Sequence, residues 1–215
     1  MKILITGFEP FGGEATNPSW QAVSALPDSV AGAEIVKLEI PVVFGRSADV
    51  VRAAVVEHDP DVIISVGQAG GRLAVSPERV AINVDDGGIP DNDGYQPIDT
   101  TIREDGPAAY FTSLPVKAMV TAMRKAGIPS QVSNTAGTYV CNHIMYQVLY
   151  LIDYEFPGKR GGFVHVPYSP QQVADHPAQP SMGIDDMVIA LVAGLEAVLA
   201  DTGKPDERAV GGAVH

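Results

Sequence analysis

Short apolar runs alternate along the chain with longer segments in which apolar residues recur every three or four positions. The short runs are rich in β-branched residues and end in glycine, proline or polar turns, which is typical of buried strands. Four runs of this kind are predicted strands: KILITGF, AEIVKLEIPV, DVIISVG and GGFVHVP. The helical spacing predicts helices that start near Pro18, Ser47, Val116, Cys141 and Ser181. RVAINVDD is expected to be extended, and SQVSNTAG to be a further strand.

The alternation of strand and helix predicts the fold class. Parallel neighbouring strands need crossover connections, and helices in those connections cover both faces of the sheet. We therefore expect an α/β protein: a single-domain α/β/α sandwich with a largely parallel or mixed central sheet flanked by helices. Residues 1–202 are expected to form this single domain. The stretch 203–215 is polar, contains glycine and has no period, so we expect a flexible C-terminal tail.

Composition and charge exclude several kinds of partner. The 215 residues carry a formal charge of −12, which disfavours nucleic acid and anionic membranes as partners. The first apolar run is too short for a signal peptide and no run reaches the length of a membrane span, so a cytoplasmic location is expected. The chain has one cysteine and five scattered histidines, so we expect no intramolecular disulfide, no metal and no cofactor.

Cys141 is the first candidate for chemistry. It follows the turn SNTAGTYV and lies at the start of the helix CNHIMYQVLYLI. Unpaired backbone N–H groups at a helix start favour a thiolate and would lower the pKa of this thiol. The alternative is that a lone cysteine is a small buried hydrophobic residue.

Two histidines could act as the base. His143 is two positions from Cys141 on the same helix, so the two side chains point in nearly opposite directions and His143 is expected to be structural. His165 lies near the end of the strand GGFVHVP, at the sheet edge where sites usually form. It can face Cys141, although a packed core histidine would look the same in the sequence.

A carboxylate and an aromatic loop complete the candidates. Glu78, in SPER, could hold the imidazole tautomer, or it could be an exposed ion pair with its neighbour Arg79. The loop GFEPFGG places Phe8 and Phe11 beside glycines, which suits the wall of a small apolar pocket. It lacks the Lys-Ser/Thr pair of a phosphate loop and the GxGxxG of a dinucleotide fold.

The chain resembles the pyroglutamyl peptidase I family, also called pyrrolidone-carboxylate peptidases, from Met1 to about Ala200. Four stretches carry the resemblance: GFEPFGGEATNPSW, GQAGGRLAVSPERVAINVDDGGIPDNDGYQPID, SNTAGTYVCNHIMY and FVHVPYSP. The resemblance implies a thiol-dependent omega peptidase that removes an N-terminal pyroglutamyl (5-oxoprolyl) residue from peptides through a thioester. It also implies a homotetramer.

The resemblance further implies roles for individual residues. Glu78, Cys141 and His165 match the catalytic triad of the family. The residues matching its substrate pocket are Phe8, Phe11, Asn17, Gln68, Ile89, Tyr139 and Val140. Tyr139 stands where relatives often have phenylalanine, which adds a hydroxyl that needs a partner.

Gly88 is the largest departure from the family pattern. Relatives commonly carry an arginine there, which some accounts connect with the developing oxyanion, and glycine cannot supply that charge. We expect backbone N–H groups near Cys141 to suffice, with Arg79 or Arg72 as alternatives.

Three rival functions remain open at this stage. A non-catalytic homologue could use the same pocket to bind a lactam or peptide. An ordinary aminopeptidase would pair the substrate amine with Asp85 or Asp86. A nucleoside-phosphorylase-like enzyme would need phosphate-binding arginines at a glycine-rich loop, which GFEPFGG does not provide.

Overall fold

A six-stranded mixed sheet forms the centre of the computed structural model, which describes residues 1–201, 203 and 205–210. Its strand order is β2-β3-β1-β4-β8-β5, and the four central strands are parallel. Those four strands are β1 (Lys2–Phe8), β3 (Ala33–Ile40), β4 (Val62–Gln68) and β8 (Arg160–Val166). The edge strands β2 (Ser29–Val30) and β5 (Ser76–Pro77) run antiparallel to their neighbours.

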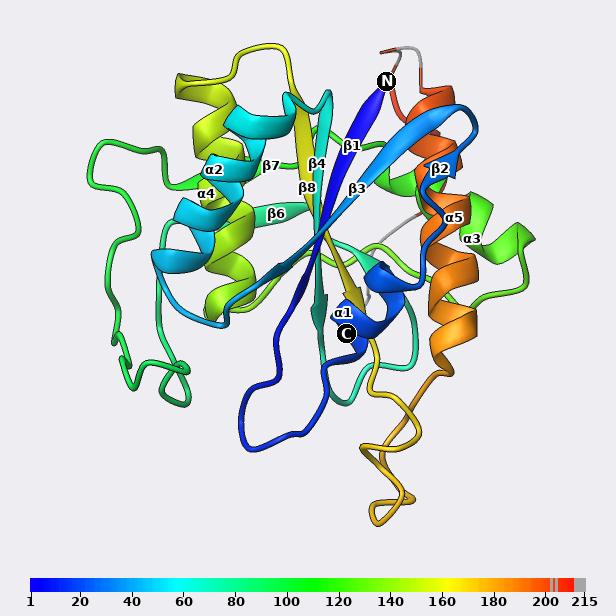
Figure 1. Ribbon diagram of the computed structural model, residues 1–215, viewed down its shortest axis with the longest axis horizontal. Helices are drawn as coiled ribbons and strands as arrows, with labels where there is room; N and C mark the ends of the chain where they lie inside the picture. The colour runs from blue at the N-terminus through cyan, green and yellow to red at the C-terminus, as the bar shows by residue number, and fades with distance from the viewer. Residues whose placement is uncertain (202, 204, 211–215) are drawn as a thin grey trace.

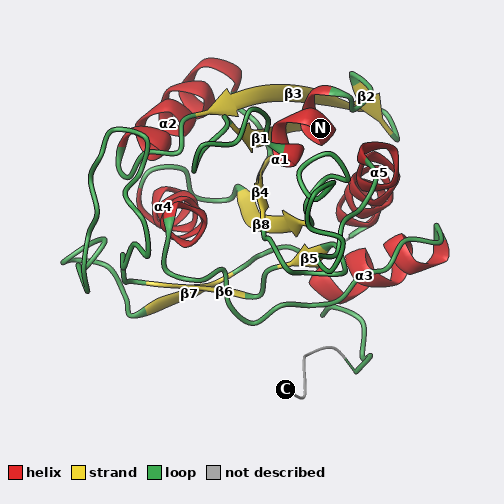
Figure 2. Ribbon diagram, turned by 90° about the horizontal axis from the view of Figure 1, so that it is seen from below, coloured by secondary structure: helices red, strands yellow, loops and turns green. Residues whose placement is uncertain are grey.

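Helices cover both faces of the sheet, as the alternating pattern predicts (Figure 2). One face carries α2 (Arg46–His58) and α4 (Val140–Tyr154). The other carries α1 (Pro18–Ser24) and α5 (Ile184–Ala200), and α3 (Val116–Lys125) packs beside α5. A separate antiparallel pair, β6 (Val80–Ile82) and β7 (Ala109–Phe111), lies beside α4. The predicted α/β sandwich with a mixed central sheet is confirmed.

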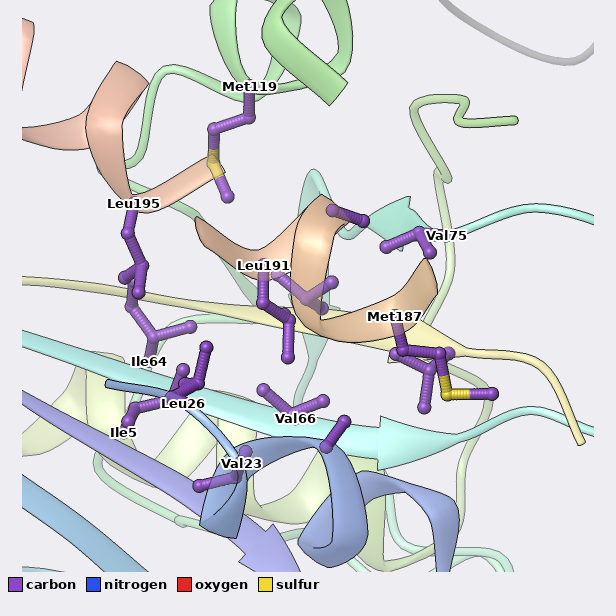
Figure 3. Close-up of a cluster of buried hydrophobic side chains, with 14 of the residues drawn as sticks. Ile5, Val23, Leu26, Ile64, Val66, Val75, Met119, Met187, Leu191 and Leu195 are labelled. Atoms are coloured by element: carbon purple, nitrogen blue, oxygen red, sulfur yellow. The ribbon is translucent and has the colours of Figure 1, made fainter. Parts of the chain in front are cut away.

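Alternation along the strands divides the core in two. Leu4, Ile63 and Phe163 face α2 and α4, whereas their neighbours in the strands face the other helices. The close-up in Figure 3 shows part of the second core, where residues of β1, β4 and α1 meet residues of α5: Ile5, Ile64, Val66, Val23, Met187, Leu191 and Leu195. Because β1, β4 and β8 are covered on both faces, each reads in the sequence as a nearly continuous apolar run, whereas β3 is partly exposed and contains Glu34, Lys37 and Glu39.

The strand predicted for SQVSNTAG is wrong. The segment 130–137 runs beside β5 but makes only isolated bridges, from Ser130 to Val75 and from Ser133 to Glu78. The Ser133 hydroxyl accepts from the backbone N–H of Thr135, and Gly137 has a φ of +78°. Local turn hydrogen bonds of this kind compete with a regular ladder.

The C-terminal helix begins at Ile184, three residues later than predicted. Within the tail predicted over 203–215, the structure describes 203 and 205–210, and the other positions lie outside the described residues. The Asp206 carboxylate accepts from the backbone N–H groups of Lys117 and Ala118, so it caps the start of α3. In the described part of the chain, no helix has the length and apolar character needed to cross a membrane.

Candidate active site

The candidate site lies at the carboxyl ends of the parallel strands, where the loops after β1, β4 and β8 gather below the sheet in Figure 1. His165 is the sixth residue of β8, and Ser76 of β5 lies opposite it. Glu78 follows β5 and its backbone N–H donates to the Phe163 carbonyl at 2.9 Å. These backbone pairings bring Oε1 of Glu78 to 2.6 Å from Nδ1 of His165.

Burial makes the Glu78–His165 contact electrostatically strong. Glu78 is 0% exposed and His165 is 3% exposed. An ionised carboxylate only accepts, so Nδ1 of His165 carries the donated proton and Nε2 is left to accept one. Burial lowers the pKa of His165, the Glu78 carboxylate opposes this, and the Arg72 charge adds to the lowering. The imidazole is therefore held neutral, in the tautomer that a general base requires.

Arg72 is a member of the site that the family resemblance does not include. Its Nη1 donates to the same oxygen of Glu78 at 2.6 Å, and its Nη2 donates to the Thr135 carbonyl at 3.1 Å. The hypothesis of an exposed Glu78 paired with its chain neighbour is therefore wrong. Glu78 Oε2 is buried and has no hydrogen-bond partner among the described residues. The guanidinium places a positive charge directly against this buried carboxylate.

Cys141 is the second residue of α4, so its position at a helix start is confirmed. Its sulfur lies against β4: a Cβ added to Gly67 would be 2.8 Å from Sγ. Gly67 pairs with His165 in the register of β4 and β8, so both residues are directed to the same face of the sheet. Gly67 therefore leaves room for the thiol beside the imidazole strand. A glycine within a buried strand was the available sequence signal for this close approach.

The direction of the thiol pKa is opposite to the one expected from the helix start. The pKa of Cys141 is raised to about 12, first by burial and then by the negative charge of Glu78, while Arg72 opposes the rise. The sequence-based expectation of a lowered pKa is therefore wrong, because removal from water outweighs the favourable helix terminus. The resting site contains a neutral thiol and a neutral imidazole.

A narrow, largely apolar pocket opens beside the cysteine. It is lined by Phe8, Phe11, Asn17, Val42, Gln68, Tyr139, Val140 and Cys141. The structure thus brings together six of the seven residues that match the family's pocket, and adds Val42. The seventh, Ile89, is not part of this lining and is 45% exposed, near Gly12. Larger hollows, such as one between α3 and α5, contain none of the candidate residues.

Asn17 serves the shape of the pocket more than its polarity. Its Oδ1 accepts from the backbone N–H and the hydroxyl of Ser19, at 3.0 and 2.8 Å. Its Nδ2 donates to the Glu9 carbonyl at 2.9 Å. Asn17 is therefore the N-cap of α1 and also fixes the loop after β1. Gln68, at the end of β4, is the other amide in the lining.

Hydrogen bonds tie the pocket wall to the segment that contains Ile89. The Tyr139 hydroxyl donates to the Pro90 carbonyl at 3.0 Å, so the extra hydroxyl has a partner directed away from the apolar ring surface. Asn92 donates to Glu9 Oε1 at 2.8 Å and to the Pro10 carbonyl at 2.9 Å. Three separate loops are thereby fixed around the pocket.

His143 is structural, as predicted. Its Nδ1 lies 2.7 Å from Asp85 Oδ2, and its Nε2 accepts from the backbone N–H of Gly45 at 3.0 Å. Because a backbone N–H can only donate, the imidazole proton is on Nδ1 and faces Asp85. Both ring nitrogens are occupied, and Asp85 is not available to a substrate amine.

Gly88 is exposed, and a Cβ added there would meet nothing within 4 Å. No group of three or more His, Cys, Asp or Glu side chains in the described residues could hold a metal ion.

The α/β fold and the grouping of thiol, imidazole and carboxylate are those of a cysteine-type peptidase. A family model described as pyroglutamyl peptidase matches residues 1–201. The chain belongs to the pyroglutamyl peptidase family.

Curated relatives and solved structures agree with this family. The pyrrolidone-carboxylate peptidase of Lactobacillus johnsonii is 57% identical over 215 residues, the whole of both chains. That of Levilactobacillus brevis is 59% identical over 199 residues, 93% of this chain and 98% of the relative. The crystal structure of pyroglutamyl peptidase I from Bacillus amyloliquefaciens superposes with a TM-score of 0.93 at 45% identity, over 97% of this chain and 99% of that chain.

Proposed function

We propose that the chain hydrolyses the bond after an N-terminal pyroglutamyl residue of peptides, with Cys141 as nucleophile, His165 as general base and Glu78 as the residue that orients the imidazole. The observation that carries this proposal is the buried 2.6 Å contact between Glu78 and His165, on the strand beside Cys141 and the apolar pocket. Family membership independently supports the peptidase activity.

The neutral resting pair defines the order of proton transfer. Nε2 of His165 takes the proton from Sγ of Cys141 as the sulfur attacks the carbonyl carbon of the pyroglutamyl residue. The imidazolium, stabilised by Glu78, returns that proton to the departing amine nitrogen as the C–N bond breaks. A water molecule, deprotonated by the same nitrogen, then cleaves the thioester and releases pyroglutamate and the free thiol. Nucleophile and base are regenerated together.

The lining of the pocket supports the choice of substrate. None of its eight residues is charged: it consists of aromatic and aliphatic surface with two amides, one tyrosine and the cysteine. A pyroglutamyl ring is a neutral lactam without a free amine, so this lining suits it better than an N-terminal ammonium. The aminopeptidase hypothesis is disfavoured further because Asp85 is buried and paired with His143.

Backbone N–H groups are the proposed stabilisers of the oxyanion. The first N–H groups of a helix lack intrahelical acceptors, and Cys141 lies at the second position of α4. Arg72 is committed to Glu78 and Thr135, so it does not replace the arginine that relatives carry at the position of Gly88.

The decisive experiment is release of a chromophore from a pyroglutamyl amide under reducing conditions. Wild type should turn the substrate over, and Cys141→Ser should lose at least about 10³-fold in kcat. A glutamyl amide and a prolyl amide should be poor substrates of the wild type. If the folded wild type released no chromophore, the hypothesis of a homologue that only binds its ligand would be favoured instead. The presence of all three of Glu78, Cys141 and His165 argues against that hypothesis.

Location and assembly belong to the same proposal. A homotetramer in the cytoplasm is supported by the family resemblance alone, and residues 1–202 are proposed as a single domain. The charge of −12 suits neither nucleic acid nor an anionic membrane as a partner. Light scattering of the purified protein tests the assembly: a mass of about one chain would contradict the tetramer.

A further inference from the structure

Gln172 lies in the segment between β8 and α5, and its Nε2 donates to Oε1 of Gln68 at 2.8 Å. We infer that Gln172 is a positioning residue that makes Gln68 present its NH₂ end, a hydrogen-bond donor, to the lactam carbonyl of the substrate. This inference rests on the pocket assigned under the proposed function, and it adds a residue that the pocket lining does not include.

A backbone group determines the orientation of both amides. The backbone N–H of Ser169 lies 3.0 Å from Oε1 of Gln172, and the Ser169 hydroxyl lies 3.4 Å from it. A backbone N–H can only donate, so the group of Gln172 that faces it must be the carbonyl oxygen. Its NH₂ group then faces Gln68, which must offer its own carbonyl oxygen. The end of Gln68 left for the pocket is Nε2, a donor.

The backbone at Ser169 is held firmly enough to determine which end of the Gln172 amide faces it, and therefore which end of Gln68 faces the pocket. Ser169 is 1% exposed and lies four residues after His165. The carbonyl of the preceding residue, Tyr168, accepts from Met182 N at 2.9 Å. The carbonyl of Ser169 itself accepts from Gln172 N at 3.2 Å. Tyr168 packs so closely on Gly70 that a Cβ there would lie 2.2 Å from the ring. We call this series of hydrogen bonds the relay: it runs from the Ser169 backbone, close in sequence to the proposed base, through Gln172 to Gln68 in the pocket.

The relay gives the pocket a chemical preference. The ring carbonyl of a pyroglutamyl residue is an acceptor and matches a donor at Gln68, whereas a prolyl ring has no group there. A donor that a bound ring covers without offering it an acceptor costs binding free energy, so a ring that lacks the carbonyl is rejected. If the amide of Gln68 rotated by half a turn, it would present an oxygen and repel the lactam carbonyl.

Two ring compounds of nearly the same shape test the polarity as competitive inhibitors: 2-pyrrolidinone, whose exocyclic oxygen accepts, and 2-iminopyrrolidine, whose protonated nitrogen donates. Wild type should favour 2-pyrrolidinone. In Gln172→Glu, one carboxylate oxygen still accepts from Ser169 N–H and the other accepts from Gln68, which must rotate its amide. The ratio of the two inhibition constants should then shift by at least about tenfold toward 2-iminopyrrolidine.

Matched variants separate this effect from added charge and from misfolding. Gln171→Glu adds the same charge at an exposed neighbouring position, and its inhibitor ratio should equal that of wild type. Gln172→Met keeps the length without a polar end, and it should weaken 2-pyrrolidinone binding without creating a preference for 2-iminopyrrolidine. Thermal unfolding of each variant confirms that the compared proteins are folded.

An unchanged ratio in Gln172→Glu, or an equal shift in Gln171→Glu, would overturn the role of Gln172. Gln68→Leu distinguishes this failure from failure of the pocket assignment. If Gln68→Leu loses affinity for 2-pyrrolidinone while the Gln172 variants do not, the pocket stands and the relay is wrong. If Gln68→Leu binds 2-pyrrolidinone as wild type does, the assigned pocket itself is wrong, and the inference fails with it.

Discussion

The imidazole of His165 and the guanidinium of Arg72 share one oxygen of Glu78, each from 2.6 Å. The buried carboxylate thus receives two donors on Oε1, while Oε2 receives none from the described residues. Arg72 places its positive charge against Glu78 and at the same time lowers the pKa of His165. The three groups act as one unit, so a change at Glu78 affects both the tautomer and the basicity of the imidazole.

Glu78→Gln tests the orienting role of the carboxylate. The amide can turn its NH₂ toward Nδ1 of His165, which would leave the imidazole proton on Nε2 and remove the base. We expect kcat to fall by about 10²- to 10⁴-fold while the protein stays folded. Steady-state kinetics with a pyroglutamyl amide measures the loss. Glu57→Gln, at an exposed site on α2, is the control and should leave kcat unchanged.

Alkylation of Cys141 should report the raised thiol pKa. The thiolate is the species that reacts with iodoacetamide, and a pKa of about 12 keeps its population small at neutral pH. The second-order rate should therefore keep rising about tenfold per pH unit from pH 8 to pH 10. Free cysteine, with a thiol pKa of about 8.5, should level off over the same range. A plateau near neutral pH would instead indicate a thiolate–imidazolium pair at rest.

Gly67→Ala should displace the nucleophile. The added methyl group would lie 2.6 Å from Cζ of Phe163 and 2.8 Å from Sγ of Cys141. Phe163 is 0% exposed and cannot move freely, so the thiol must shift. We expect kcat to fall about 10²-fold, together with a loss of about 1–3 kcal/mol in the free energy of unfolding.

Gly183→Ala is the matched control for Gly67→Ala. Its Cβ would meet only Asp186 Oδ2, at an ordinary 3.5 Å. Urea denaturation and turnover of both variants provide the comparison. Equal behaviour of the two would contradict a tight fit of the thiol against β4.

Gly88→Arg tests whether the backbone suffices at the oxyanion. The site is open, so the free energy of unfolding should change by less than about 0.5 kcal/mol. If the backbone N–H groups of α4 do the work, kcat should change by less than about threefold, which is under 1 kcal/mol. Gly88→Gln controls for the length of the new side chain. A tenfold gain specific to arginine would show that charge at this position assists the reaction.

The central strands and helices could be predicted because apolar periodicity and propensity act locally. Other small elements could not. β5 has two residues and exists only because β8 offers it an edge. The extended segment expected at RVAINVDD contains β6, but its short extent depends on Asn142, whose side chain bonds to both the N–H and the carbonyl of Ile82. No local pattern in the sequence encodes partners so distant in the chain.

The same distinction holds at the site. The placement of Cys141 at a helix start and of His165 near a strand end followed from local pattern. The burial of Glu78, the attachment of Arg72 and the raised pKa of the thiol depend on tertiary packing. The position of Cys141 at a helix start alone predicted the wrong direction for the thiol pKa. The burial of the thiol, which raises that pKa, comes from β4 and Phe163 rather than from α4.

Because the chain has a single cysteine, the mass of each molecule reports the chemical state of its proposed active-site thiol. Because the chain contains one sulfhydryl, a thiol-specific reagent can modify cysteine only where the proposed chemistry takes place. The mass increment per chain then gives the fraction of blocked centres directly, without engineering the sequence or correcting for labelling at other cysteines. An acyl group retained from the substrate would appear in the same spectrum as a different increment, so blocked, acylated and empty molecules could be counted side by side.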